Sequence, residues 1–314
     1  GGIALNAGQD PTFFGNISAG GNADDTGYGN FKYDVPAGFL SLCTGNLPVA
    51  DAIDPAQTDD NFPQKLFNTI LYTGNGSTQS ITGVGFKPDL AWIKRRNATQ
   101  SHRLADSTRG AKTLYPDDVI DEDDMAISYT SDGFDWGSGT GVANNANANG
   151  GTYAAWNWRA NGGTTSTNSN GTLNDTTVQV DPSGGFSIVS YVGNGTTGTL
   201  GHGLSAVPTF YIVRDRNNGN NWVIYSKEAG ATKFGILDSG AAFATDAMWD
   251  NTDPTSTVFS VRTNTENNGN GRNYIGYFFA DVEGYIKSGS YIANSDADNA
   301  FVYTGFRPAF VLVK

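Results

Sequence analysis

An internal repeat is the feature that most constrains how this chain of 314 residues can fold. Similar segments begin at Tyr72, Tyr191 and Tyr291, and a Gly and then a Pro follow at comparable distances in each copy. The spacing of roughly 100 to 120 residues is longer than the 20 to 50 residues of solenoid repeats. The repeat therefore predicts copies of one domain-sized unit, arranged along the chain as separate beads.

The repeat also divides the chain into segments. The third copy breaks off after about 24 residues, and we infer that the chain is part of a longer polypeptide. Segments rich in Asp, Pro and Gln, or in Thr, Ser and Asn, are predicted to be linkers. The predicted segments are 1–50, a different β unit; 51–65, a linker; 66–163, repeat 1; 164–185, a linker; 186–288, repeat 2; and 289–314, the start of repeat 3.

The repeats predict an all-β fold. Each copy has an apolar run after its proline, at 90–93, 210–213 and 310–313, which is typical of a strand buried between two layers. Residues 186–191 alternate between apolar and polar side chains, as in a half-buried strand. Asn-Gly turn signals recur, and no long helical periodicity is present. We expect each repeat to form an aligned β-sandwich.

Charge and composition exclude several partners. The net charge of −12 repels phosphate groups, so we expect neither nucleic-acid binding nor attachment to an anionic membrane. No apolar run reaches 18 residues, so we expect no membrane-spanning segment. Cys43 is the only cysteine, which excludes a disulfide within the chain.

Catalytic motifs are absent from the sequence. The chain has four Glu residues without the paired spacing of a β-sandwich glycosidase, and no nucleophile elbow or phosphate-binding loop. Gly193–Gly198 fits a dinucleotide-binding pattern, but the residues after it cannot begin a helix, so we expect a turn. His102 and His202 occupy non-equivalent positions and do not complete a metal site. We predict a protein that is not an enzyme, and the acidic run 117–124 leaves Ca²⁺ open as a cofactor.

Two tryptophans are candidate ligand-binding residues. Trp136 lies in a polar, Gly-rich segment beside Asp135, and Trp249 lies beside Asp250. An indole face next to polar side chains is typical of sugar recognition. The alternative is that each indole folds back as a lid over its own sandwich. Trp92, Trp156 and Trp158 lie in predicted strands and are expected in the core.

One basic cluster stands out in this acidic chain, made of Arg95, Arg96, His102, Arg103 and Arg109. The cluster could meet the acidic run 117–124 of a neighbouring subunit, which would give a self-complementary assembly. The alternative is a solvated surface.

The repeats resemble a known family, the lectin-like repeats of large virion proteins from tailed phages. The resemblance rests on residues 72–97, 101–110, 131–134 and 153–159, and it weakens in the second repeat. Residues 3–13 and 35–48 resemble the last strands of a SPRY-like β-sandwich. The resemblance implies tandem concanavalin-A-like jelly-roll domains and a place on a virion appendage, but it supplies no catalytic residues.

This resemblance leads to an expected function. We expect a structural and adhesive virion protein, a tail-fibre-like appendage on the virion surface that contacts host-surface glycans. Its partners would be other virion proteins and other copies of itself, as a homotrimer by analogy with fibre proteins. A capsid decoration protein without a ligand, a bacterial surface adhesin that binds polysaccharide, and a depolymerase are the alternatives.

Overall fold

The computed structural model describes residues 12, 15–41, 43–46, 62–137, 145–181, 185–293 and 300–314. The chain forms two compact units, residues 1–60 and 61–314, which are described separately. The strands of the second unit, together with a single turn of helix α2, confirm the all-β prediction. The elements are η1 (Thr44–Asn46), α2 (Pro63–Leu66), β1 (Phe67–Thr73), β2 (Gln79–Ile81), β3 (Leu90–Arg95), β4 (Arg103–Asp106), β5 (Lys112–Thr113), β6 (Asp123–Asp124), β7 (Ile127–Thr130), β8 (Gly133–Trp136), β9 (Thr152–Trp158), β10 (Ser166–Asn168), β11 (Thr176–Asp181), β12 (Phe186–Val192), β13 (Gly198–Gly201), β14 (Phe210–Asp215), β15 (Val223–Ser226), β16 (Lys233–Ile236), β17 (Ala244–Thr245), β18 (Val258–Val261) and β19 (Asn273–Phe279).

The N-terminal unit is organised around the carboxylate of Asp24, which is 6% exposed. Its oxygens accept hydrogen bonds from the backbone N–H groups of Thr26, Tyr28 and Ser41 at 2.8–3.0 Å, and from Nδ2 of Asn46. A buried carboxylate with this many donors holds loops together without regular strands. Much of the predicted SPRY-like segment, including residues 3–8, lies outside the described residues, as do residues 51–61 of the predicted linker.

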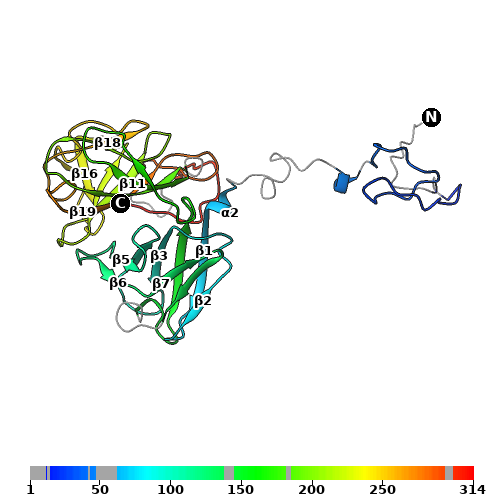
Figure 1. Ribbon diagram of the computed structural model, residues 1–314, viewed down its shortest axis with the longest axis horizontal. Helices are drawn as coiled ribbons and strands as arrows, with labels where there is room; N and C mark the ends of the chain where they lie inside the picture. Colours follow the sequence, from blue (N-terminus) through cyan, green and yellow to red (C-terminus); the bar gives the residue numbers. More distant parts are fainter. Residues whose placement is uncertain are drawn as a thin grey trace. The chain divides into compact units, whose positions relative to one another are not determined.

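The first repeat is a sandwich of two sheets. Strands β1-β9-β3-β4 form one sheet and β2-β8-β7 form the other. Side chains from both sheets meet in one core, which includes Tyr72, Ile93, Phe134 and Tyr153. Figure 1 shows these strands, in cyan and green, as one body of the C-terminal unit.

The second repeat is built around an eight-stranded sheet in the order β10-β11-β12-β19-β14-β15-β16-β17, with β13-β18 as the opposite layer. A core that includes Tyr211, Trp249, Phe259 and Phe278 lies between the two. The sequence repeat is a structural one, because the stacked pair Tyr72–Tyr153, at 4.9 Å, has a counterpart in Tyr191–Tyr274, at 5.1 Å. The expected turn at Gly193–Gly198 is confirmed, because no helix follows it.

The segment 164–185 was predicted to be a linker, and it instead carries β10 and β11. Strand β11 pairs antiparallel with β12, with Thr177 opposite Ser190. Its Thr-rich composition resembles a loop, but Thr is β-branched and Val178 and Val180 lie at the alternate positions of a strand. The segment therefore belongs to the large sheet of the second repeat.

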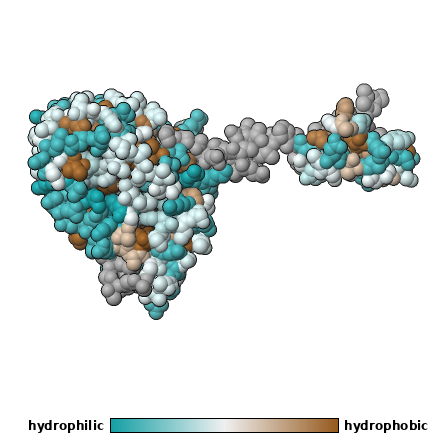
Figure 2. All heavy atoms as spheres, in the orientation of Figure 1, coloured by the Kyte–Doolittle hydropathy of each residue, from teal (hydrophilic) through white to brown (hydrophobic). Residues whose placement is uncertain are grey.

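The two repeats are not separate beads, because they share a third core. Trp158 of the first repeat packs against both Phe186 and Phe279 of the second, with ring centroids 6.5 and 6.4 Å away. The shared core contains side chains from β3, β4 and β9 on one side and from β12, β14, β15 and β19 on the other. The C-terminal unit is therefore a stack of sheets with apolar cores between them, and the face seen in Figure 2 carries only scattered hydrophobic patches.

Residues 310–313 were expected to form a strand like β3 and β14, and the structure shows none there. No neighbouring strand pairs with this segment in the described part of the chain, and a lone strand is not stable in water. No helix among the described residues has the length and apolar composition that a membrane crossing requires.

Candidate functional site

The predicted ligand-binding indoles are buried. Trp136 is 1% exposed and Trp249 is 0% exposed. Trp136 lies in β8, not in a flexible loop, since β8 pairs with both β2 and β7. The alternation of β8 turns Phe134 and Trp136 into the core and leaves Asp135 outside, half-buried. Trp136 is therefore not a ligand contact. Its indole packs into its own sandwich, which was the alternative interpretation of the sequence.

Trp249 is held in the second core, with its ring 4.9 Å from Tyr211 and perpendicular to it. The neighbouring Asp250 is half-buried at a positive φ of 52° and lies 3.7 Å from Nε of Arg262. No indole face is accessible at either predicted position, and only Asp135 and Asp250 reach the surface.

The acidic run and the basic cluster meet within one chain. Nη1 of Arg109 donates to Glu122 at 2.9 Å, and Arg109 also pairs with Asp106. Nη2 of Arg216, in the second repeat, donates to the other oxygen of Glu122 at 2.6 Å. The hydroxyl of Tyr277 accepts from Arg109 at 3.0 Å and donates to Asp106 at 2.6 Å. These contacts, which we expected between neighbouring subunits, join the two repeats.

Burial is nearly complete at this ion-pair network. The side chains of Arg109, Asp106 and Glu122 are 1%, 0% and 5% exposed. Burial raises the pKa of Glu122, but the hydrogen bonds and charges of Arg216 and Arg109 outweigh burial and lower it. Glu122 is therefore charged at neutral pH, and the role of the network is structural because its groups are already paired with one another.

The rest of the acidic run is also engaged by protein groups. Asp117 accepts from the backbone N–H of His102, Asp121 from that of Gly219, and Asp124 pairs with Lys112. The described residues contain no group of three or more His, Cys, Asp or Glu side chains placed to hold a metal ion.

His202 is a core residue of the second repeat. It is 0% exposed. Its Nδ1 accepts from the backbone N–H of Leu204 at 3.1 Å, which leaves Nε2–H to donate to the carbonyl of Thr255 at 3.1 Å. This arrangement suits the neutral imidazole, and burial lowers the pKa of His202 to about 4.

This burial predicts a pH dependence of stability. The unfolded chain binds a proton at His202 below about pH 6.5, whereas the folded chain does so only near pH 4. Between these values the unfolded state holds more protons, so stability falls as the pH falls. We expect a loss of about 2 kcal/mol from this residue between pH 7 and pH 5. Urea denaturation of the wild type and of His202→Gln at both pH values measures it. An equal pH dependence in the two proteins would contradict the assignment.

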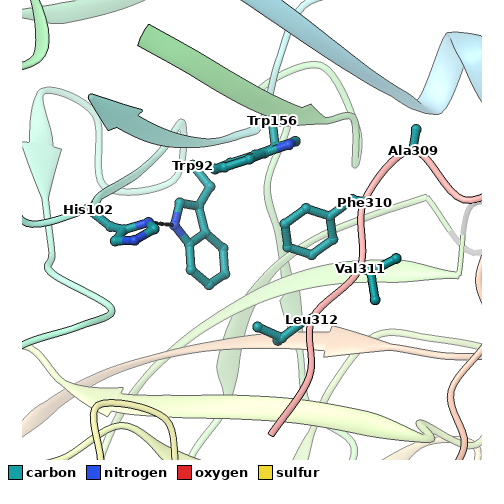
Figure 3. Close-up of a pocket in the computed structure, with 7 residues that line it drawn as sticks. All are labelled: Trp92, His102, Trp156, Ala309, Phe310, Val311 and Leu312. Atoms are coloured by element: carbon teal, nitrogen blue, oxygen red, sulfur yellow. Dashed lines mark hydrogen bonds between the residues drawn. The ribbon is translucent and has the colours of Figure 1, made fainter. Parts of the chain in front are cut away.

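An aromatic cavity lies beside the first repeat. A cavity of about 290 Å³ is bounded by Trp92, His102 and Trp156 on one side and by residues 309–312 on the other. Trp92 and Trp156 are directly opposite each other on β3 and β9. Figure 3 shows both indoles facing the ring of Phe310. We call the surface formed by Trp92, Trp156 and His102 the aromatic groove.

A hydrogen bond organises the polar edge of this groove. Nε1 of Trp92 donates to Nδ1 of His102 at 2.9 Å, drawn as the dashed line in Figure 3. Because Nδ1 accepts, the proton of the neutral ring is on Nε2, which can donate to a ligand. Burial, and then the charge of Lys94, lowers the pKa of His102, so the ring is neutral at pH 7. Apolar rings with one oriented N–H donor suit binding of a ring-shaped ligand, and the groove lining supplies no carboxylate or hydroxyl for catalysis.

Sequence reasoning placed Trp92 and Trp156 in the core, and the structure confirms this, because Trp92 is 9% exposed and Trp156 packs against the shared core. The groove at the edge of that core was not predicted. A comparison of the two repeats could have indicated the groove, because Trp92 aligns with Ile212 and Trp156 aligns with Tyr277. Two tryptophans replace smaller side chains in one copy only.

The fold defines the class of protein: a β-sandwich protein whose two repeats share a core. Residues 62–314 match the family described as a domain of unknown function, DUF7483, and the chain belongs to this family. The comparisons with curated proteins and with solved structures found no match.

Proposed function

We propose that the chain is a structural and adhesive component of a tailed-phage virion appendage, exposed on the virion surface, where it contacts host-surface glycans. The observation that carries the adhesive part is the aromatic groove, in which two indoles and a neutral imidazole N–H border one cavity. Stacking surface with a few oriented polar groups is the usual chemistry of a sugar site. The appendage part rests on the sequence resemblance, as do the jelly-roll topology, the homotrimer and contacts with other virion proteins.

The packing of the C-terminal unit supports a rigid structural role. The shared core and a buried ion-pair network fix the first repeat against the second. A rigid stack presents a surface groove in a fixed orientation, which a projecting adhesive protein requires.

Immunogold electron microscopy with antibodies raised against residues 62–314 tests this proposal. We expect label on fibres or tail tips of particles in lysates, and we expect Fab fragments of the same antibodies to reduce adsorption to host cells at least several-fold. Fab fragments against an unrelated capsid surface are the control. Label spread over heads would replace the proposal with a capsid decoration protein, and label on cell envelopes without particles would replace it with a bacterial adhesin.

A further inference from the structure

The sheet face that carries the aromatic groove is covered at one end and open at the other. Trp158 lies opposite Leu90 and is covered by the second repeat. Trp92 and Trp156 form the next cross-strand pair on the same face, two residues further along each strand. Beyond them Leu71 is 61% exposed. Trp92 and Trp156 therefore lie at the edge of the core that the two repeats share.

The equivalent place in the second repeat is filled by protein. Ile212 and Tyr277 are 3% and 0% exposed there. Trp222, at the position that aligns with His102, donates its Nε1–H to the carbonyl of Tyr115 in the first repeat at 2.7 Å. In the second repeat the pair Ile212 and Tyr277 is therefore covered by protein, whereas in the first repeat the pair Trp92 and Trp156 borders a cavity.

One side chain occupies the groove in this structure. The ring of Phe310 lies 5.9 Å from Trp92, 5.6 Å from Trp156 and 5.2 Å from Trp158, tilted or perpendicular to each. The groove therefore accepts a six-membered ring, and a cavity of about 290 Å³ remains beside Phe310.

The segment that carries Phe310 is weakly held. Among the described residues, 305–313 make no backbone–backbone hydrogen bond. Val311 and Val313 are 69% and 63% exposed, whereas Phe306 and Phe310 are half-buried. Two side chains also hold the segment, since Lys314 donates to the carbonyl of Ser239 and Thr304 to that of Phe306. Without backbone pairing, it can leave at a smaller cost than a paired strand.

We propose that the aromatic groove binds a neutral pyranose ring in the place that Phe310 occupies, and that Phe310 competes with the sugar for it. The inference rests on the proposed adhesive function and names its site. The apolar face of the sugar would pack on Trp92 and Trp156, and a hydroxyl would accept from Nε2–H of His102. The net charge of −12 disfavours anionic ligands, so the proposed sugar is neutral.

Fluorine NMR of the full chain labelled with 5-fluorotryptophan tests this inference, since the six tryptophans give six resonances. The probes are the methyl glycosides of glucose, galactose and N-acetylglucosamine, titrated in the millimolar range. We expect at least one glycoside to shift the resonances of Trp92 and Trp156 and to leave those of Trp136, Trp222 and Trp249 unchanged.

The variant Phe310→Ala removes the internal competitor. We expect it to bind the glycoside about ten-fold more tightly, because the dissociation constant falls as the open fraction rises. Phe301→Ala is the matched control, since Phe301 lies in the same segment but is 88% exposed. Its affinity should equal that of the wild type.

Three results would overturn the inference: no shift with any glycoside in Phe310→Ala, equal shifts of all six resonances, or shifts produced only by a synthetic peptide of residues 305–313. The last would make the groove a peptide-docking surface. Failure of this inference can be distinguished from failure of the proposed function, because gold label on appendages does not depend on sugar binding in the groove. Conversely, glycoside binding would stand even if the label lay on cell envelopes.

Discussion

Replacing Trp136 with alanine is expected to lower the free energy of unfolding by about 3–5 kcal/mol. The indole is 1% exposed and packs edge-on against Phe134 at 5.6 Å, in a core bounded by two sheets. Removing it leaves a cavity that strands paired on both sides of β8 cannot close. Urea denaturation followed by fluorescence of the remaining tryptophans measures the loss.

Leu71→Ala is the control for this variant. Leu71 belongs to the same sandwich but is 61% exposed, so we expect a change within about 0.5 kcal/mol. Unchanged stability of Trp136→Ala together with weaker adsorption to host cells would contradict the burial of Trp136 and return it to the surface as a ligand contact.

Arg109→Leu is expected to cost about 3–5 kcal/mol, because it leaves the buried carboxyl groups of Asp106 and Glu122 without their shared partner. The loss should exceed that of an ordinary surface ion pair because water cannot reach either carboxylate. Glu122 would retain Arg216, whereas Asp106 would retain the hydroxyl of Tyr277 and the backbone N–H of residue 109 but no cation. Thermal and urea denaturation of the variant provide the measurement.

Lys112→Ala supplies the matched control three residues away. Lys112 pairs with Asp124, and their side chains are 39% and 85% exposed. Exposed pairs contribute less than about 1 kcal/mol, so this variant should unfold almost as the wild type does. Similar losses in the two variants would show that the network of Arg109 is not buried in solution.

Local patterns in the sequence predicted much of the fold. The apolar runs at 90–93 and 210–213 became β3 and β14, each between two neighbours in its sheet. A strand that is buried on both faces needs consecutive apolar residues, and such a run can be recognised in a single sequence. The turn at Gly193–Gly198 was equally local, since Gly195 has a φ of 69° that favours glycine.

What the sequence could not predict depends on contacts between distant residues. Strand β11 is stabilised by pairing with β12, and polar strand residues differ little from loop residues in composition. The packing of one repeat on the other likewise follows from Trp158 meeting Phe186 and Phe279, a match of shapes that no periodicity reports. The groove was missed because it lies at the edge of the shared core, where Trp156 is half-buried while its counterpart Tyr277 is fully buried.

The shared core has a consequence for synthesis of the chain on the ribosome. Trp158 emerges about 120 residues before Phe279, which covers it. At roughly 5–20 residues per second, the first sandwich waits for about 6 to 24 seconds with that face in water. During this interval the nascent chain presents a flat apolar sheet that chaperones, or the same face of a neighbouring nascent chain on the polysome, can bind.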